Sequence, residues 1–134
     1  MTHAMTFPTT PLAASGWELR VGRGSRHRPA LEVHTGDGLI DVAVAGGRGA
    51  ALIRGAVRGR DWSLAWGELP PGGEVLVEFH GRGSSVLKTT AVTIAGAFWV
   101  AEVPGRYRSI VVITAVDRVS VRLRRFREAR LSRR

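Results

Sequence analysis

The residue types that most often perform catalysis or bind metals are few in this chain and lie far apart. The four histidines, His3, His27, His34 and His80, occupy different sequence contexts, and none has a second ligand at a metal-binding spacing such as His-x-x-x-His. The chain has no cysteine, which excludes a disulfide scaffold, a thiolate zinc site and a cysteine nucleophile. We therefore predict a protein that is not an enzyme and that uses no metal or cofactor.

Two glycine-rich loops contain serines without the patterns that make serine reactive. The segments Gly22–Ser25 and Gly81–Ser85 lack both the Gly-x-Ser-x-Gly nucleophile elbow and the Lys-Ser/Thr ending of a phosphate-binding loop. Asp37 and Asp41 lie near one another in sequence, but the further oxygen ligands that calcium requires are not visible around them. We interpret these residues as parts of turns and strand surfaces.

Tryptophans are the second kind of candidate functional residue. Trp62, Leu64 and Trp66 fall on one face of an expected strand, where they form either an exposed platform for sugar rings or a partner, or the inner face of a sandwich. We favour the inner face. Trp99 has the opposite phase to Phe98, so its strand is either buried on both faces or presents Trp99 to a partner. All three tryptophans are kept as candidate partner-binding residues.

The third candidate for a functional role is the positive charge of the C-terminal residues. The net charge of the chain is +9, of which residues 118–134 contribute +7 through eight arginines and one acid, Glu128. This tail is read as a short amphipathic helix that docks on an acidic partner, as an electrostatic arm for nucleic acid, or as a solvated terminus. The candidate partner-binding residues are Arg124, Arg125, Phe126, Arg127 and Arg130. The polyanion alternative uses Arg23, Arg26, Arg28, Arg122, Arg133 and Arg134.

Short alternating segments separated by glycine and proline must position these residues. Residues 98–103 and 110–113 read as two strands folded around a Pro104–Gly105 turn, and Asp37–Gly38 marks a hairpin. Eight or nine such strands at roughly ten-residue spacing predict an all-β fold, a single antiparallel β-sandwich of two stacked sheets, Ig-like or transthyretin-like. The expected organisation is a loose leader (1–15), the sandwich (16–123) and an arginine-rich tail (124–134).

No apolar run approaches the roughly 18–20 residues that span a bilayer, and the first fifteen residues lack the pattern of a signal peptide. We therefore expect a cytoplasmic protein.

Five segments occur in an order typical of one family. They are Ile53-Arg-Gly55-x-Val57, Pro70-Pro71-Gly72, Glu74–Glu78, Gly96-x-Phe98-x-Val100 and Glu102-Val-Pro-Gly-Arg-Tyr107. Over about residues 50–116 the chain resembles the carboxypeptidase regulatory-like (transthyretin-like) β-sandwich domains, although Ala95 replaces their usual Asp or Asn and one proline precedes Gly105. The resemblance implies a non-catalytic sandwich that packs beside or recruits another domain, here in a bacterial signalling or regulatory system.

These observations predict a non-catalytic interaction or accessory module that binds a protein partner. The alternatives are nucleic-acid or polyanion binding through the tail and carbohydrate binding through exposed tryptophans. Pairing of two copies through an edge strand remains open.

Overall fold

The computed structural model describes residues 9–46 and 51–127, which form thirteen strands and one short 3-10 turn, η1 (Ser25–His27). The strands are β1 (Thr9–Pro11), β2 (Glu18–Arg23), β3 (Pro29–Thr35), β4 (Gly38–Val44), β5 (Gly55–Arg58), β6 (Trp62–Glu68), β7 (Leu76–His80), β8 (Val86–Thr90), β9 (Val92–Ile94), β10 (Phe98–Pro104), β11 (Ser109–Ile113), β12 (Arg118–Arg122) and β13 (Arg124–Arg125). Among the described residues, no helix has the length and apolarity that crossing a membrane would require.

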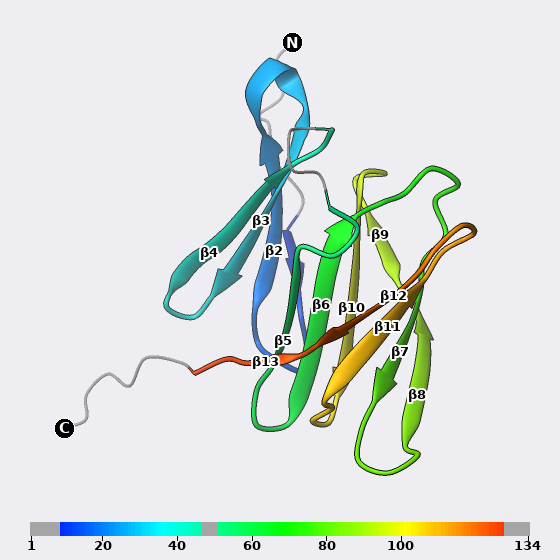
Figure 1. The fold of residues 1–134 in the computed structure, drawn as a ribbon. Helices are drawn as coiled ribbons and strands as arrows, with labels where there is room; N and C mark the ends of the chain where they lie inside the picture. Colours follow the sequence, from blue (N-terminus) through cyan, green and yellow to red (C-terminus); the bar gives the residue numbers. More distant parts are fainter. Residues whose placement is uncertain (1–8, 47–50, 128–134) are drawn as a thin grey trace, which may run out of the picture.

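The strands assemble into three sheets. The first sheet has the order β1-β2-β3-β4, the central sheet β13-β5-β6-β10-β9, and the third sheet β12-β11-β7-β8. All neighbouring strands are antiparallel except β13 and β5, which are parallel. Figure 1 shows the three sheets side by side, with the five-stranded sheet in the middle. The predicted all-β sandwich is confirmed, but it has three layers rather than the expected two.

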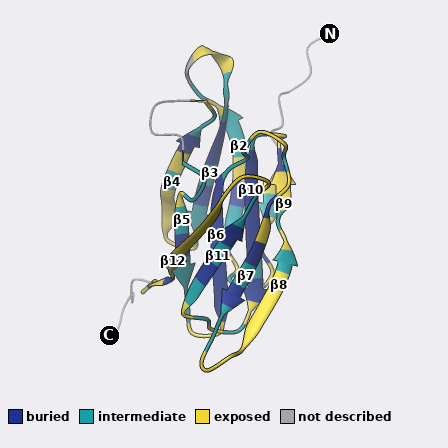
Figure 2. Cartoon of the chain, turned by 45° about the vertical axis from the view of Figure 1, so that its right-hand side comes forward, coloured by how far each residue is buried: buried dark blue, intermediate teal, exposed yellow. Residues whose placement is uncertain are grey.

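The central sheet is apolar on both faces, and this is why a third layer forms. On one face of β6, Trp62, Leu64 and Trp66 pack in one core with residues of the first sheet. These are Trp17, in the turn between β1 and β2, Leu19 of β2, and Leu31 and Val33 of β3. Ala65 of β6 and Trp99, Ala101 and Val103 of β10 pack in a second core with Val77, Phe79, Ile110 and Val112 of the third sheet. In Figure 2, β6 and β10 are almost wholly buried, whereas β8 at one edge is exposed.

The chain changes layers at two places. The segments on either side of the Pro104–Gly105 turn, predicted as two strands folded around it, do not pair with each other, since β10 belongs to the central sheet and β11 to the third. Residues 86–94 divide at Ala91 into β8, which pairs with β7, and β9, which pairs with β10. The Ala91 N–H donates to Val75 O at this crossing. Short crossing strands of this kind raise the count from the expected eight or nine to thirteen in the described residues.

Both ends of the sandwich extend beyond their predicted limits. The expected leader is wrong for residues 9–15, because β1 pairs with β2, Leu12 is buried, and the Glu102 carboxylate accepts hydrogen bonds from the Ala14 and Ser15 N–H groups at 3.0 and 2.8 Å. The helical alternative for the tail is wrong for residues 124–127, where β13 pairs with β5. Arg130, Arg133 and Arg134 lie outside the described residues.

Candidate functional site: an arginine-lined end of the sandwich

The tryptophans are buried and do not form a binding surface. Trp62, Trp66 and Trp99 are only 7%, 3% and 0% exposed. Two of their indole N–H groups also form internal hydrogen bonds: Trp66 Nε1 donates to Asp41 Oδ2 at 2.9 Å and Trp99 Nε1 to Leu52 O at 2.7 Å. The prediction that these residues contact a partner is therefore wrong, and the carbohydrate alternative loses the exposed rings that it required. The opposite phase of Trp99 and Phe98 instead marks a strand buried on both faces.

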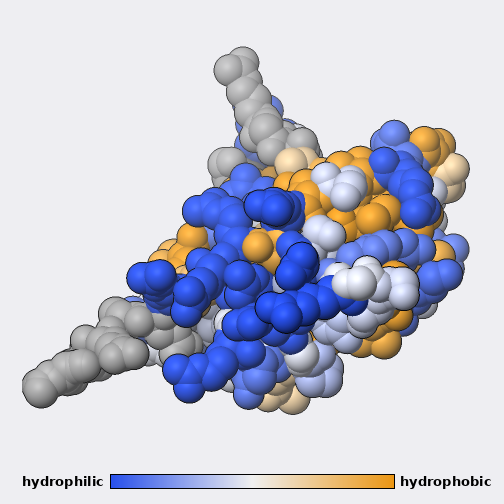
Figure 3. All heavy atoms as spheres, turned by 60° about the horizontal axis from the view of Figure 1, so that its bottom comes forward, coloured by the Kyte–Doolittle hydropathy of each residue, from blue (hydrophilic) through white to orange (hydrophobic). Residues whose placement is uncertain are grey.

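Seven arginines from separate parts of the sequence meet at one end of the molecule. We call them the arginine cluster: Arg58, Arg60, Arg82, Arg106, Arg108, Arg125 and Arg127. They come from the end of β5 and the β5–β6 turn, the β7–β8 turn, the β10–β11 turn, and β13 with Arg127, two positions after it. All of these connections lie at the lower end of the sandwich in Figure 1, and Figure 3 shows hydrophilic side chains spread across that end.

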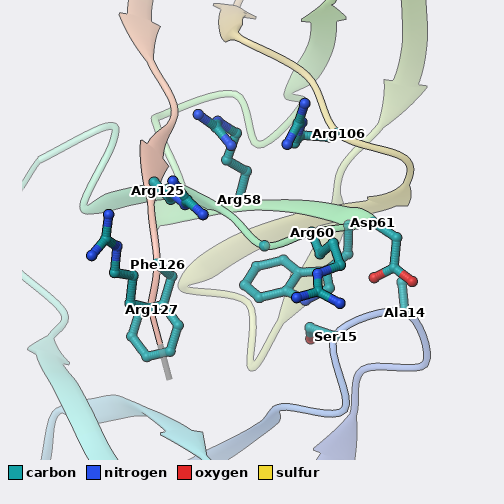
Figure 4. Close-up of a pocket in the computed structure, with 11 residues that line it drawn as sticks. Ala14, Ser15, Arg58, Arg60, Asp61, Arg106, Arg125, Phe126 and Arg127 are labelled. Carbon is teal, nitrogen blue, oxygen red and sulfur yellow. The ribbon is translucent and has the colours of Figure 1, made fainter. Parts of the chain in front are cut away.

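The arginine cluster surrounds two adjoining cavities. The larger, of about 900 Å³, opens between the β1–β2, β5–β6 and β10–β11 turns and is lined by Ala14, Ser15, Arg58, Gly59, Arg60, Asp61, Trp62, Arg106, Arg125, Phe126 and Arg127. The smaller, of about 560 Å³, is lined by Arg58, Gly81, Arg82, Ser85, Gly105, Arg106, Tyr107, Arg108 and Arg125. Arg58, Arg106 and Arg125 line both cavities. Figure 4 shows the side chains around the larger cavity, with Asp61 on the side of Ala14.

The positive charge of this end is not neutralised within the described part of the chain. There, the arginines that form ion pairs are Arg20, Arg54 and Arg118, and no member of the arginine cluster does so. Partial burial and the neighbouring guanidinium groups of Arg106, Arg125 and Arg108 lower the pKa of Arg58. A guanidinium group nevertheless stays protonated in proteins, so the site presents concentrated, fixed positive charge.

A buried hydroxyl fixes the turn that carries Arg106 and Arg108. Ser63 is 0% exposed; its Oγ–H donates to Gly105 O at 2.9 Å and its Oγ accepts from the Tyr107 N–H at 3.0 Å. The Gly105 N–H in turn donates to Asp61 O at 2.7 Å, which ties this turn to the β5–β6 turn. Gly105 has a φ of 99°, a left-handed conformation that glycine adopts without steric penalty. The arginines therefore stand on turns held by backbone hydrogen bonds.

The C-terminal residues enter the site because the chain is anchored on both sides of Arg125. Leu123, before it, is buried in the second core, and its N–H donates to Arg108 O at 2.9 Å. Phe126, after it, packs against Trp17 with ring centroids 4.7 Å apart, and its N–H donates to Arg58 O at 2.8 Å. The parallel register of β13 and β5 sets Arg125 opposite Arg58.

The structure brings together only part of the predicted basic set. Arg125, Phe126 and Arg127 line the larger cavity, whereas Arg122 and Arg124 are exposed but line neither cavity. Arg23, Arg26 and Arg28 belong to the β2–β3 connection at the opposite end of the sandwich (Figure 1). Their predicted cooperation with the C-terminal arginines is therefore wrong.

Sequence reasoning missed the five arginines that precede the C-terminal segment. Three of them follow a turn glycine directly, in Gly59-Arg60, Gly81-Arg82 and Gly105-Arg106. This repeated Gly-Arg step in connections at the same end of the sheets was the available signal. Its weakness is that Gly22-Arg23 has the same pattern and lies at the other end.

Comparisons of the chain with protein-family models, with curated proteins and with solved structures give no match. The resemblance to carboxypeptidase regulatory-like domains therefore stays a prediction.

Proposed function

We propose that this protein is a binding module for a polyanion, which it holds on the arginine cluster without changing it chemically. The observation that supports the proposal is the convergence of seven arginines, from four separate parts of the chain, on two cavities with a shared wall. Like charges repel, and the pKa of Arg58 is lowered by partial burial and, after that, by this repulsion from Arg106, Arg125 and Arg108. An anionic ligand would remove it.

The chemistry of the guanidinium group supports binding rather than catalysis. Its planar fork donates two parallel hydrogen bonds to a phosphate or carboxylate, and it stays protonated near neutral pH, so it does not act as a general base. The Ser63–Gly105–Asp61 hydrogen bonds hold the turns before the ligand arrives, so little order has to be created on binding. A protein partner stays a prediction, and an acidic surface on such a partner would compete for the same arginines.

The test compares two variants that lose the same charge. The site variant combines Arg58→Gln, Arg106→Gln and Arg125→Gln, and the control combines Arg20→Gln, Arg23→Gln and Arg26→Gln, which lie on β2 and the β2–β3 connection. Binding of inorganic polyphosphate is measured by titration calorimetry between about 50 and about 200 mM salt. The unmodified protein should bind more weakly as salt rises, because binding releases counterions from the phosphate chain.

The site variant should lose at least about 30-fold in affinity, which corresponds to about 0.7 kcal/mol for each arginine. Its slope of log affinity against log salt should fall by about 3, one for each lost phosphate contact. The control variant should retain both the affinity and the slope. Equal losses in the two variants would show that only net charge matters, and would exclude the arginine cluster as the site.

A further inference from the structure

We infer that the polyanion is a single strand of nucleic acid. The inference rests on the proposed function and adds the chemical class of the ligand. Its basis is that each cavity combines arginines with a partly buried aromatic ring: Phe126 in the larger and Tyr107 in the smaller. Charge alone would need no rings, whereas a nucleotide presents both a phosphate and a flat base.

The arrangement of the two cavities fits a polymer in which each unit carries a phosphate and a flat base. Arg58, Arg106 and Arg125 form the wall that both cavities share, and each cavity adds arginines of its own, Arg60 and Arg127 on one side and Arg82 and Arg108 on the other. The sugar-phosphate backbone crosses the shared wall, where guanidinium groups match phosphate oxygens. Neighbouring bases then enter the two cavities, and a base of any sequence can stack on an aromatic ring.

Other polyanions would contact the arginines but not the aromatic rings. In a duplex the faces of the bases are stacked inside the double helix, so only phosphates and groove edges could reach the recessed cavities. An acidic peptide would pair with the arginines through carboxylates but has no flat base for Phe126 and Tyr107. A flexible single strand satisfies the arginines and the rings together.

The experiment measures fluorescence anisotropy of labelled oligonucleotides of about twelve nucleotides, a length within the range that single-strand binding folds cover. The probes are single-stranded DNA, single-stranded RNA and the corresponding duplex, with polyphosphate and poly-glutamate as unlabelled competitors. At least one single strand should bind about tenfold or more tightly than the duplex, poly-glutamate or polyphosphate, a difference of about 1.4 kcal/mol. The two single strands distinguish a DNA ligand from an RNA ligand.

Tyr107→Leu tests the ring directly, with Tyr107→Phe as its matched control. Stacking on one ring contributes enough that Tyr107→Leu should weaken single-strand binding about fivefold or more while leaving polyphosphate binding unchanged. Tyr107→Phe should retain both. Because Tyr107 also packs on Phe79 (ring centroids 5.8 Å apart), Phe126→Leu repeats the test in the other cavity if Tyr107→Leu does not fold.

Each result has a distinct meaning. If duplex, poly-glutamate or polyphosphate binds as tightly as both single strands, or if Tyr107→Leu weakens polyphosphate and single strand equally, the single-strand inference is overturned while the proposed polyanion function stands. If polyphosphate and every oligonucleotide fail to bind at low salt, the proposed function itself is wrong.

Discussion

Removal of one buried hydroxyl should destabilise the protein and loosen the arginine cluster at the same time. Ser63 is the buried polar residue of the described chain, and its Oγ is the partner of both Gly105 O and the Tyr107 N–H. Ser63→Ala leaves these two backbone groups without a partner, and each unsatisfied buried group costs about 1–3 kcal/mol. We therefore expect a loss of about 2–4 kcal/mol in the free energy of unfolding.

The measurement is urea denaturation followed by tryptophan fluorescence, because all four tryptophans are buried. The midpoint should fall and the m-value should stay unchanged. Ser120→Ala, at an exposed position of β12, is the control and should stay within about 0.5 kcal/mol of the unmodified protein. Affinity for polyphosphate should also fall, since Arg106 and Arg108 stand on the turn that Ser63 holds. A change below about 0.5 kcal/mol in the free energy of unfolding for Ser63→Ala would refute the reasoning, because the two hydrogen bonds of the hydroxyl would then not stabilise the turn.

Three further perturbations test other contacts. Gly67→Ala should destabilise the protein by about 3 kcal/mol or more in urea denaturation, because a Cβ there overlaps Leu52 O, a backbone atom. Arg58→Gln should raise the melting temperature at low salt by roughly 1–4 °C, because partial burial and the neighbouring arginines lower the pKa of Arg58, so the folded state disfavours its charge. About 1 M salt screens the repulsion between the arginines but not the cost of burial, so the gain should become smaller there. On the third sheet, the hydrogen bond from His80, followed by the charges of Arg118 and Lys88, lowers the pKa of Glu78 against the opposing effect of burial. Glu78 therefore stabilises the fold above its unfolded pKa, and this stability is lost as pH falls through the lower folded pKa. Glu78→Gln should make the melting temperature less dependent on pH below about pH 4.5, and an unchanged pH profile would contradict this assignment.

The strands could be predicted because the signals that specify them are local. Asp37–Gly38 predicts the hairpin that joins β3 and β4, and the run from Ile110 to Ile113 predicts a strand, which the structure has as β11. The phase of Trp99 against Phe98 offered two interpretations, and packing against the third sheet decided between them. Alternation of apolar and polar residues along a strand is a property of neighbouring residues, so it can be recognised without knowledge of the fold.

The number of layers could not be predicted in the same way. A turn such as Pro104–Gly105 has the same residues whether its strands pair in one sheet or pass to different sheets. Here the choice depends on Trp99 and Val103 of β10, which pack against Phe79, Ile110 and Val112 across the second core. Phe79 and Trp99 lie twenty positions apart in the sequence, and no local pattern records their contact. The five arginines that precede the C-terminal segment were missed for the same reason, since they become neighbours of Arg125 and Arg127 only once turns of the central and third sheets share one end.

The charge of the site and the rigidity of its frame depend on each other. Seven guanidinium groups on unattached turns would move apart, since each gains free energy by increasing its distance from the others. The Gly105 N–H to Asp61 O and Phe126 N–H to Arg58 O bonds prevent this by joining the β10–β11 turn and the C-terminal segment to β5 and its turn. Ser63 adds the side-chain contact that keeps the turn of Arg106 in place. The repulsion is therefore stored in the folded protein rather than relaxed, and under the proposed function an anion between the arginines would release it.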